Sequence, residues 1–289
     1  MDCAKRLVTS AIKTTVSFAL IIVLRQGDAS DVPVPANTYD PNKVVSVATL
    51  EGYAPFCFRQ SVAETNEIGE LIPPGHDSKR LQGFSWDVVR LSLHHKGYTI
   101  KLMVYPWARV ISLARRNEVD VVFPAAKTGV RSQFLVFSKY PVNTVHYVIY
   151  VNKKKQNNWR GLEDIIGVRL AGMRGWDYGR YWNAHLELIE LREVNTVEQG
   201  FQMLDHNRVE GLAGYEEVFD HYLIEKGMDE KFGKLPAFDQ GFEFLSGNKL
   251  NPNIKQILND FDSSRQRLFK QGILVKLKKH WFPLSNSDI

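Results

Sequence analysis

The stretch from Val119 to Val142 constrains the fold of this chain more than any other part of the sequence. It opens with an apolar run, Val119 to Phe123, interrupted only by Asp120, and then reaches Pro124, where we expect the strand to end. Valine and phenylalanine favour a strand that is buried on both faces. The sequence therefore predicts a central strand of an open α/β sheet at this position.

Polar residues follow this predicted strand at its carboxyl end. Lys127, Thr128, Gly129 and Arg131 come within a few residues of Pro124. Ligands of open α/β sheets bind outside this edge of the sheet. A planar, permanently charged guanidinium suits a carboxylate or a phosphate, so Arg131 is a candidate ligand-binding residue. The alternative interpretation of Arg131 is a surface ion pair.

Two extended runs indicate two lobes. Beyond Arg131 the chain is apolar from Phe134 to Phe137, turns at residues 138–141, and leaves in an extended run from Val145 to Val151. A second extended run, Gly241 to Leu245, comes much later. Two strands that each leave one sheet and enter another predict a two-lobed protein with a hinge.

Each half of the chain shows strands that alternate with helices. In the first half, strands at 45–49, 98–105 and 119–123 alternate with helices at 84–96 and 107–117, which predicts a parallel sheet. In the second half we expect a short helix at 159–166, strands at 168–171, 186–191 and 209–213, and helices between them. Asn195 with Glu198 resembles a capping box for one of these helices. Two further helices follow Pro252.

Two asparagines introduce matching segments. Asn117-Glu118-Val119-Asp120 follows one amphipathic helix, and Asn207-Arg208-Val209-Glu210 follows another. Each segment opens a strand whose far end is expected to face the same crevice.

A polar stretch of 23 residues runs from Gln60 to Gln82 and contains Pro73-Pro74-Gly75. Loops of that length are usually functional or disordered. We interpret it as a flexible excursion of the chain, with a lid over the crevice as the alternative.

The amino terminus has the pattern of an export signal. Basic residues precede an apolar stretch of 11 residues, 14–24, which is too short to span a bilayer, and small residues precede Ser30. We therefore expect a signal peptide at residues 1–29, a flexible tail at 30–43 and a periplasmic location. An uncleaved anchor is the alternative.

Composition and cysteine content narrow the function classes. The chain has 289 residues, and its formal charge of +5 is too mild and too dispersed to indicate nucleic-acid binding. Cys3 lies in the predicted signal, which leaves Cys57 as a free thiol that we expect to be buried and inert.

Short motifs in a fixed order resemble a known family. They are Gly-Tyr-x-Pro-Phe from Gly52, Gly-Phe-x-x-Asp from Gly83, Thr-x-x-Arg from Thr128, Phe-Ser-x-Tyr-Pro from Phe137, and Phe-Lys-Gln-Gly from Phe269. Together they resemble the family 3 extracellular solute-binding proteins, the periplasmic receptors of polar amino acid ABC importers. The resemblance covers about residues 44–283.

The resemblance implies a fold of two α/β lobes, each a mainly parallel sheet flanked by helices, joined by two hinge strands. On this basis, residues 44–144 plus 242–289 would form the first lobe and 145–241 the second. The lobes would close on a ligand by a hinge motion.

The resemblance also implies roles for single residues. Arg131 would bind an α-carboxylate, with Thr128 beside it, and Tyr53 and Trp107 would stack on the ligand. Trp176 and Asp177 lie at a helix start, which favours an anion. The interpretation of the tryptophans as core or rim residues, and of Asp177 as a helix cap, stays open.

This chain departs from the family pattern at two places. Tyr215 stands where amino-acid-binding members carry the acid that pairs with the ligand's ammonium, and Pro124-Ala125-Ala126 stands where hydroxyl side chains are usual. A buried ammonium needs a paired charge, for which Asp177 and Glu216 are the candidates. A carboxylate-bearing or aromatic solute is equally open.

We expect a binding protein rather than an enzyme. The sequence has no G-x-S-x-G, H-E-x-x-H or P-loop motif, and the adjacent His94 and His95 point to different helix faces. We expect no catalytic residue, cofactor or metal site. The expected partners are a small-molecule solute and the membrane subunits of an ABC importer, with the protein a monomer. The alternatives are a lyase resembling cyclohexadienyl dehydratase and a sensor or partner-binding module.

Overall fold

The computed structural model describes residues 43–60, 69–155 and 159–282. Its first half is built on a parallel sheet in which β1 pairs with both β5 and β6, as the alternating pattern predicts. The elements of this half are β1 (Val44–Thr49), α1 (Phe84–His94), β5 (Thr99–Val104), α2 (Trp107–Arg115), β6 (Val121–Ala126), the 3-10 helix η2 (Arg131–Gln133) and β7 (Leu135–Phe137).

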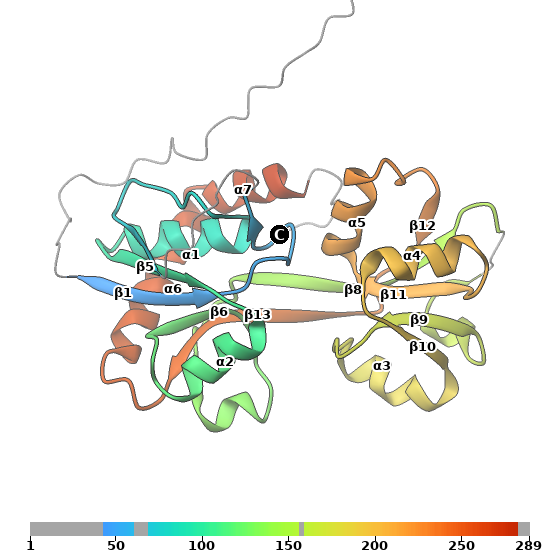
Figure 1. Cartoon of the computed structure of the whole chain (residues 1–289), viewed down its shortest axis with the longest axis horizontal. Helices are drawn as coiled ribbons and strands as arrows, with labels where there is room; N and C mark the ends of the chain where they lie inside the picture. Colours follow the sequence, from blue (N-terminus) through green and yellow to red (C-terminus); the bar gives the residue numbers. More distant parts are fainter. Residues whose placement is uncertain (1–42, 61–68, 156–158, 283–289) are drawn as a thin grey trace, which may run out of the picture.

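Two long strands connect the halves. β8 (Asn143–Asn152) and β13 (Asp239–Asn248) pair in antiparallel fashion, with Asp239 opposite Tyr147 and Glu243 opposite Asn143. They stand at the centre of one sheet with the order β10-β9-β11-β8-β13-β6-β1-β5-β3. Figure 1 shows them running between two bodies, each covered by its own helices. The expectation of two lobes joined by two hinge strands is confirmed, whereas the residue boundaries given above remain a prediction.

The second lobe repeats the alternation. β9 pairs in parallel with β10 and β11, and β11 pairs antiparallel with β8. Its elements are the 3-10 helix η3 (Leu162–Ile165), β9 (Arg169–Met173), α3 (Gly179–His185), the 3-10 helix η4 (Leu186–Leu188), β10 (Glu190–Val194), α4 (Val197–Asp205), β11 (Gly211–Tyr215), α5 (Glu216–Glu225) and β12 (Phe232–Lys234).

The carboxyl-terminal helices return to the first lobe. They are α6 (Ile254–Lys270) and α7 (Ile273–Trp281), and Gly272 between them adopts the left-handed conformation that favours glycine. Phe261 and Leu268 of α6 and Leu277 of α7 belong to the same buried core as α1.

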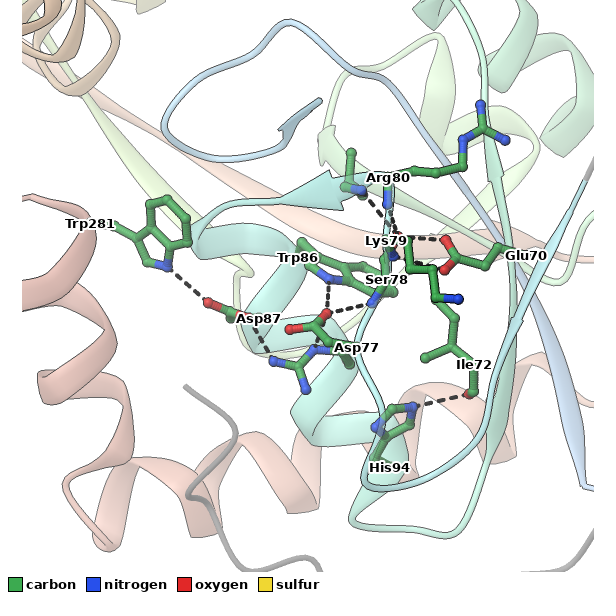
Figure 2. Close-up of polar contacts among 12 residues, drawn as sticks. Glu70, Ile72, Asp77, Ser78, Lys79, Arg80, Trp86, Asp87, His94 and Trp281 are labelled. Atoms are coloured by element: carbon green, nitrogen blue, oxygen red, sulfur yellow. Dashed lines mark hydrogen bonds and ion pairs between the residues drawn. The ribbon is translucent and has the colours of Figure 1, made fainter. Parts of the chain in front are cut away.

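The segment from Gly69 to Gln82 is tied to the first lobe. β3 (Glu70–Ile72) pairs with β5, and β4 (Leu81–Gln82) pairs with β2 (Phe58–Arg59). Figure 2 shows Asp77 accepting a hydrogen bond from Trp86 Nε1 at 2.8 Å. Residues 69–82 are therefore an ordered surface segment of the first lobe rather than a flexible excursion, while residues 61–68 lie outside the described residues.

Pro124 lies within β6 rather than at its end. Between β13 and β6 the register shifts, so that Ala125 faces Phe244 while Val122 faces Ser246. A proline cannot donate to a ladder, and strands accept it at such irregularities. The expectation that Pro124 ends the strand is therefore wrong.

Three local predictions in the second half need correction. Residues 186–188 form a 3-10 helix, and the strand expected at 186–191 is β10 instead. The helix expected over 159–166 is only the short η3. The cap of α4 is Thr196, whose side chain accepts a hydrogen bond from the backbone of Gln199, rather than Asn195.

Asn117 and Asn207 are the non-glycine residues with positive φ in the described part of the chain, at 58° and 56°. Asparagine tolerates this left-handed conformation better than most residues. Each asparagine follows the end of a helix and precedes a strand, so the matching segments seen in the sequence have the same local geometry.

Cys57 is buried, as expected, and burial raises the pKa of its thiol. The predicted signal peptide and residues 30–42 of the predicted tail lie outside the described residues. Within the described ranges, every helix is too short or too polar to cross a bilayer.

Candidate functional site

Glu243 of β13 is the centre of a polar cluster between the two hinge strands and the first lobe. Its Oε2 accepts a hydrogen bond from Asn143 Nδ2 at 2.7 Å and from the hydroxyl of Tyr53 at 3.2 Å. Burial raises the pKa of Glu243 to about 7, although these two donors and the charge of Arg131 oppose the shift. A carboxyl with this pKa changes its charge near neutral pH.

Arg131 begins η2, just past the end of β6. Its Nη1 donates to the carbonyl oxygen of Ala126 at 3.0 Å, and its guanidinium carbon lies 5.5 Å from the centre of the Trp107 ring. Burial lowers the pKa of Arg131, while Glu243 and Tyr215 act in the opposite direction. Arg131 makes no ion pair among the residues that the structure describes, so its charge is open to a ligand.

Thr128 positions Arg131 through the backbone. Its Oγ1 accepts a hydrogen bond from the backbone nitrogen of Arg131 at 3.2 Å. This contact fixes the turn between β6 and η2, and with it the place from which the guanidinium extends.

The second lobe contributes aromatic side chains. The ring of Tyr215, at the end of β11, lies 4.3 Å from that of Trp176 and 5.2 Å from that of Tyr147 on β8. Burial raises the pKa of Tyr215, and the Glu243 charge adds to the effect. These rings therefore form an apolar wall within electrostatic reach of Glu243.

The carboxylates of Asp177 and Glu216 have partners within the second lobe. Asp177 Oδ1 accepts from the backbone nitrogen of Gly179 at 3.0 Å, at the start of α3, and its carbonyl oxygen accepts from the Tyr215 hydroxyl at 2.9 Å. Glu216 forms an ion pair with Lys234 at 2.5 Å. Their carboxylates are thus occupied within the second lobe.

The contacts described above join six residues into one cluster. We call the following set the hinge cluster: Tyr53, Arg131, Asn143, Tyr147, Tyr215 and Glu243. Trp107 and Trp176 flank it through Arg131 and Tyr215, and Thr128 supports it. Asp177 contacts it through its backbone carbonyl oxygen, while its carboxylate bonds to Gly179.

Three members of the hinge cluster were not predicted from the sequence. They are Asn143, Tyr147 and Glu243, which all lie on the hinge strands. The signal that could have found Glu243 is its position as an acidic residue between Phe242 and Phe244 in an extended apolar run. Burying a charged side chain in an apolar run costs free energy unless hydrogen bonds or a paired charge compensate for it. A charge at such a place therefore indicates a hydrogen-bonded or functional group.

One further group has the spacing of metal ligands. Ligand atoms of His146, Glu216 and Glu217 lie within 4.8 Å of one another. His146 Nδ1 already lies 2.5 Å from Glu217 Oε1, and Glu216 is paired with Lys234. These contacts account for the cluster without an ion.

The hinge cluster combines groups that suit a small zwitterion or anion. A guanidinium binds a carboxylate through two parallel hydrogen bonds. A carboxyl whose pKa is near 7 can accept from an ammonium or hydroxyl group, and aromatic rings supply apolar contact.

Comparison with known proteins gives one family. Residues 71–284 match the family described as bacterial extracellular solute-binding proteins, family 3. Among curated proteins, none matches the sequence.

Three solved structures illustrate the likeness of the fold. The probable amino-acid ABC transporter extracellular-binding protein ytmK from Bacillus subtilis has a TM-score of 0.67 and 15% identity over 83% of this chain and 97% of that chain. An ancestral amino-acid-binding protein, described as a precursor of cyclohexadienyl dehydratase, has a TM-score of 0.63 and 18% identity over 84% and 96%. A histidine kinase sensor domain with similarity to periplasmic binding proteins has a TM-score of 0.63 and 15% identity over 83% and 96%. At these identities the likeness shows the fold alone, which is the two-lobed type II periplasmic binding protein fold.

Proposed function

Because the chain belongs to the bacterial extracellular solute-binding proteins of family 3, we propose that it captures a small carboxylate-bearing solute, an amino acid or a related compound, between its two lobes. The observation that carries this proposal is the half-buried guanidinium of Arg131, which has no ion pair in the described part of the chain. A partly desolvated charge of this kind gains most from a carboxylate guest.

Glu243 supplies the countercharge for an ammonium group. Tyr215 stands where the resemblance implies an acid. Glu243, on the hinge strand β13, accepts hydrogen bonds from Tyr53 and Asn143. An ammonium guest favours the ionised form of Glu243 and so offsets the cost of burying that charge. An α-amino acid would then span Arg131 and Glu243, with Tyr53, Trp107 and Trp176 against its side chain.

Binding acts on the lobes through the hinge strands. A solute that contacts both lobes only when they are closed shifts the population toward the closed form. The membrane subunits of an ABC importer would then recognise the closed lobes. The predicted amino-terminal signal supports a periplasmic location for this activity.

A thermal-shift screen of the chain without residues 1–29 tests the proposal. The screen uses amino acids, dicarboxylates and aromatic acids, and the bound compound is recovered afterwards. We expect at least one of them to raise the midpoint of unfolding in a concentration-dependent way and to be recovered unchanged. A chain that no compound stabilises would contradict the assignment.

The pKa of Glu243, about 7, favours one second candidate function. A carboxyl that titrates near neutral pH is suited to general acid–base work, and a lyase resembling cyclohexadienyl dehydratase would use it to protonate a departing hydroxyl. Incubation with prephenate or arogenate distinguishes the two functions, because only the lyase forms product. The variant Glu243→Gln should abolish such turnover.

A further inference from the structure

The reverse face of the hinge carries a cavity that shares Asn143 with the hinge cluster and none of its other members. Thr144 and His146 of β8 and Gln240 and Phe242 of β13 line it. Side chains alternate along a strand, so these four residues point away from the face that bears Glu243. Figure 1 shows α7 and α5 on one side of β8 and β13 and α2 and α3 on the other. We call this space the reverse-face cavity.

Both lobes contribute to the reverse-face cavity. From the first lobe come Arg265 and Phe269 of α6 and Leu274 of α7, and from the second lobe comes Glu217 of α5. Its volume is about 540 Å³, which lies in the range of small-molecule sites.

The walls of the cavity are apolar on one side. Phe56, Phe84, Phe242, Phe269 and Phe282 all line it. Phe242 is 45% exposed and Phe269 is 50% exposed. Large aromatic side chains left open around a concave space favour an apolar guest.

Arg265 gives the cavity a cation with an unmet hydrogen bond. Its Nε is buried and has no hydrogen-bond partner among the described residues. The nearby acid, Asp262, already accepts from the backbone nitrogens of Lys139 and Tyr140 at 2.8 and 3.0 Å. Burial lowers the pKa of Arg265, with Asp262 opposing. A buried donor without a partner is costly, and an anionic guest would remove that cost.

The acidic residue of the cavity is already satisfied. Glu217 Oε1 lies 2.5 Å from His146 Nδ1, and Glu217 Oε2 accepts from the backbone nitrogen of His146 at 3.1 Å. The hydrogen bond to Glu217 raises the pKa of His146. Glu217 is thus already hydrogen-bonded, while the cationic side chains of Arg265 and Lys278 also line the cavity. The cavity therefore favours a ligand with a negative charge.

We propose that the reverse-face cavity is a second ligand site, which binds a small amphipathic carboxylate with its carboxylate on Arg265 and its aromatic or alkyl part among the phenylalanines. This site goes beyond the proposed solute site and binds its ligand independently of it. Since the occupant touches α5 as well as α6 and α7, it stabilises the present placement of the two lobes. The effect of this second ligand on the affinity for the solute, in contrast, rests on the proposed function, because it requires that the solute site exists.

Calorimetric titration of the full chain with 3-phenylpropionate tests this site. 3-Phenylpropanol and 3-phenylpropylamine serve as probes of the same shape without the negative charge. We expect saturable binding of one 3-phenylpropionate in the reverse-face cavity, and affinity for the two controls lower by about tenfold or more. Absence of saturable binding up to about 10 mM would overturn the proposal.

Variants locate the bound probe. Arg265→Met keeps most of the side-chain length and should weaken 3-phenylpropionate binding by about tenfold or more, while Arg267→Met, on the exposed side of the same helix, should not. Thr144→Trp should fill the cavity and prevent binding even where Arg265 is intact. Circular dichroism and the midpoint of unfolding establish that each variant is folded.

Two outcomes would assign the binding elsewhere. If Arg131→Met removes binding and Arg265→Met does not, the probe occupies the hinge cluster and the proposal is wrong. If the probe binds only after removal of residues 283–289, which follow Phe282 directly, the chain's own terminus fills the cavity and the proposal is again wrong. Retained binding in Arg131→Met supports the second site even if the proposed solute function fails.

Discussion

The hydroxyl of Tyr53 donates a hydrogen bond to Glu243 Oε2 at 3.2 Å, although 190 residues separate them in the chain. The same carboxylate oxygen accepts from Asn143 Nδ2. The loop after the first strand and both crossing strands therefore meet at one carboxyl. A change in the charge of Glu243 should therefore alter the free energy of unfolding, the affinity for a ligand, and the dependence of both on pH.

The first prediction concerns Glu243→Gln and the pH dependence of stability. The pKa of Glu243 in the folded chain is about 7, above its ordinary value of 4.5, so the folded state binds this proton more tightly than the unfolded state. The contribution of this proton to the free energy of unfolding is fully present below the pKa that Glu243 has in the unfolded chain, and it is lost as the pH rises through 7. We expect Glu243→Gln to lack this loss, which is about 1 to 3 kcal/mol after a discount for partial solvation.

Denaturant titration at pH 5, 6, 7 and 8 measures this difference in the free energy of unfolding. The exposed Glu187→Gln is the control, and it should follow the wild type at every pH. Parallel stability curves for the wild type and Glu243→Gln would show that Glu243 titrates normally.

The second prediction concerns Arg131→Met and solute affinity. The guanidinium lies beside Trp107 and is half-buried, so loss of its charge should weaken a carboxylate solute by about 2 to 4 kcal/mol. The solute is the compound that the thermal-shift screen identifies, and calorimetry gives its affinity. Arg192→Met, on an exposed surface pair with Glu190, should leave that affinity unchanged. Equal affinities for Arg131→Met and the wild type would refute the role of Arg131.

Much of the fold could be predicted because its signals are local. The alternation of apolar strands and amphipathic helices placed β1, α1, β5, α2 and β6 within a few residues of their bounds. Two extended runs indicated the hinge strands. The failures came where long-range pairing decides the conformation. Pro124 continues a strand because a register shift in β13 accommodates it, and residues 70–72 form a strand because the edge of β5 is free to pair.

The candidate site could be predicted only in part. Arg131 was singled out because it follows the carboxyl end of a strand, and Trp107 because the resemblance to the family implies it, and the structure brings them together. Glu243 was missed because its importance depends on Asn143 and Tyr53, which are distant in the sequence. The positions of Asp177 and Glu216 suggested the missing acid, but their contacts with Gly179 and Lys234 depend on the packing of the second lobe.

The third prediction compares a buried ion pair with an exposed one. Asp87 accepts hydrogen bonds from Arg90 Nη2 and from Trp281 Nε1, each at 2.8 Å, and both charged side chains are only 4% exposed. Asp87→Asn should lower the free energy of unfolding by about 2 to 3 kcal/mol, because it leaves the buried Arg90 charge with Asp77 as its carboxylate partner, at 3.0 Å and with a side chain that is 48% exposed. Asp164→Asn is the control, since its partner Arg160 is 89% exposed, and it should cost less than about 1 kcal/mol. Denaturant unfolding measures both, and equal costs would contradict the argument.

The fourth prediction concerns the hinge strand β13 at Gly241. A Cβ at this position would overlap the phenol oxygen of Tyr147. Tyr147 is only 6% exposed, and its ring packs against Tyr215 and Phe238, so it cannot yield without moving the aromatic wall of the hinge cluster. We expect Gly241→Ala to lower the free energy of unfolding by about 1 to 3 kcal/mol and to weaken solute binding as well. Gly129→Ala is the matched control, because a Cβ there meets no other atom within 4 Å, and it should change stability by less than about 0.5 kcal/mol. If Gly241→Ala unfolds and binds solute as the wild type does, Tyr147 moves freely and does not hold Tyr215 in place.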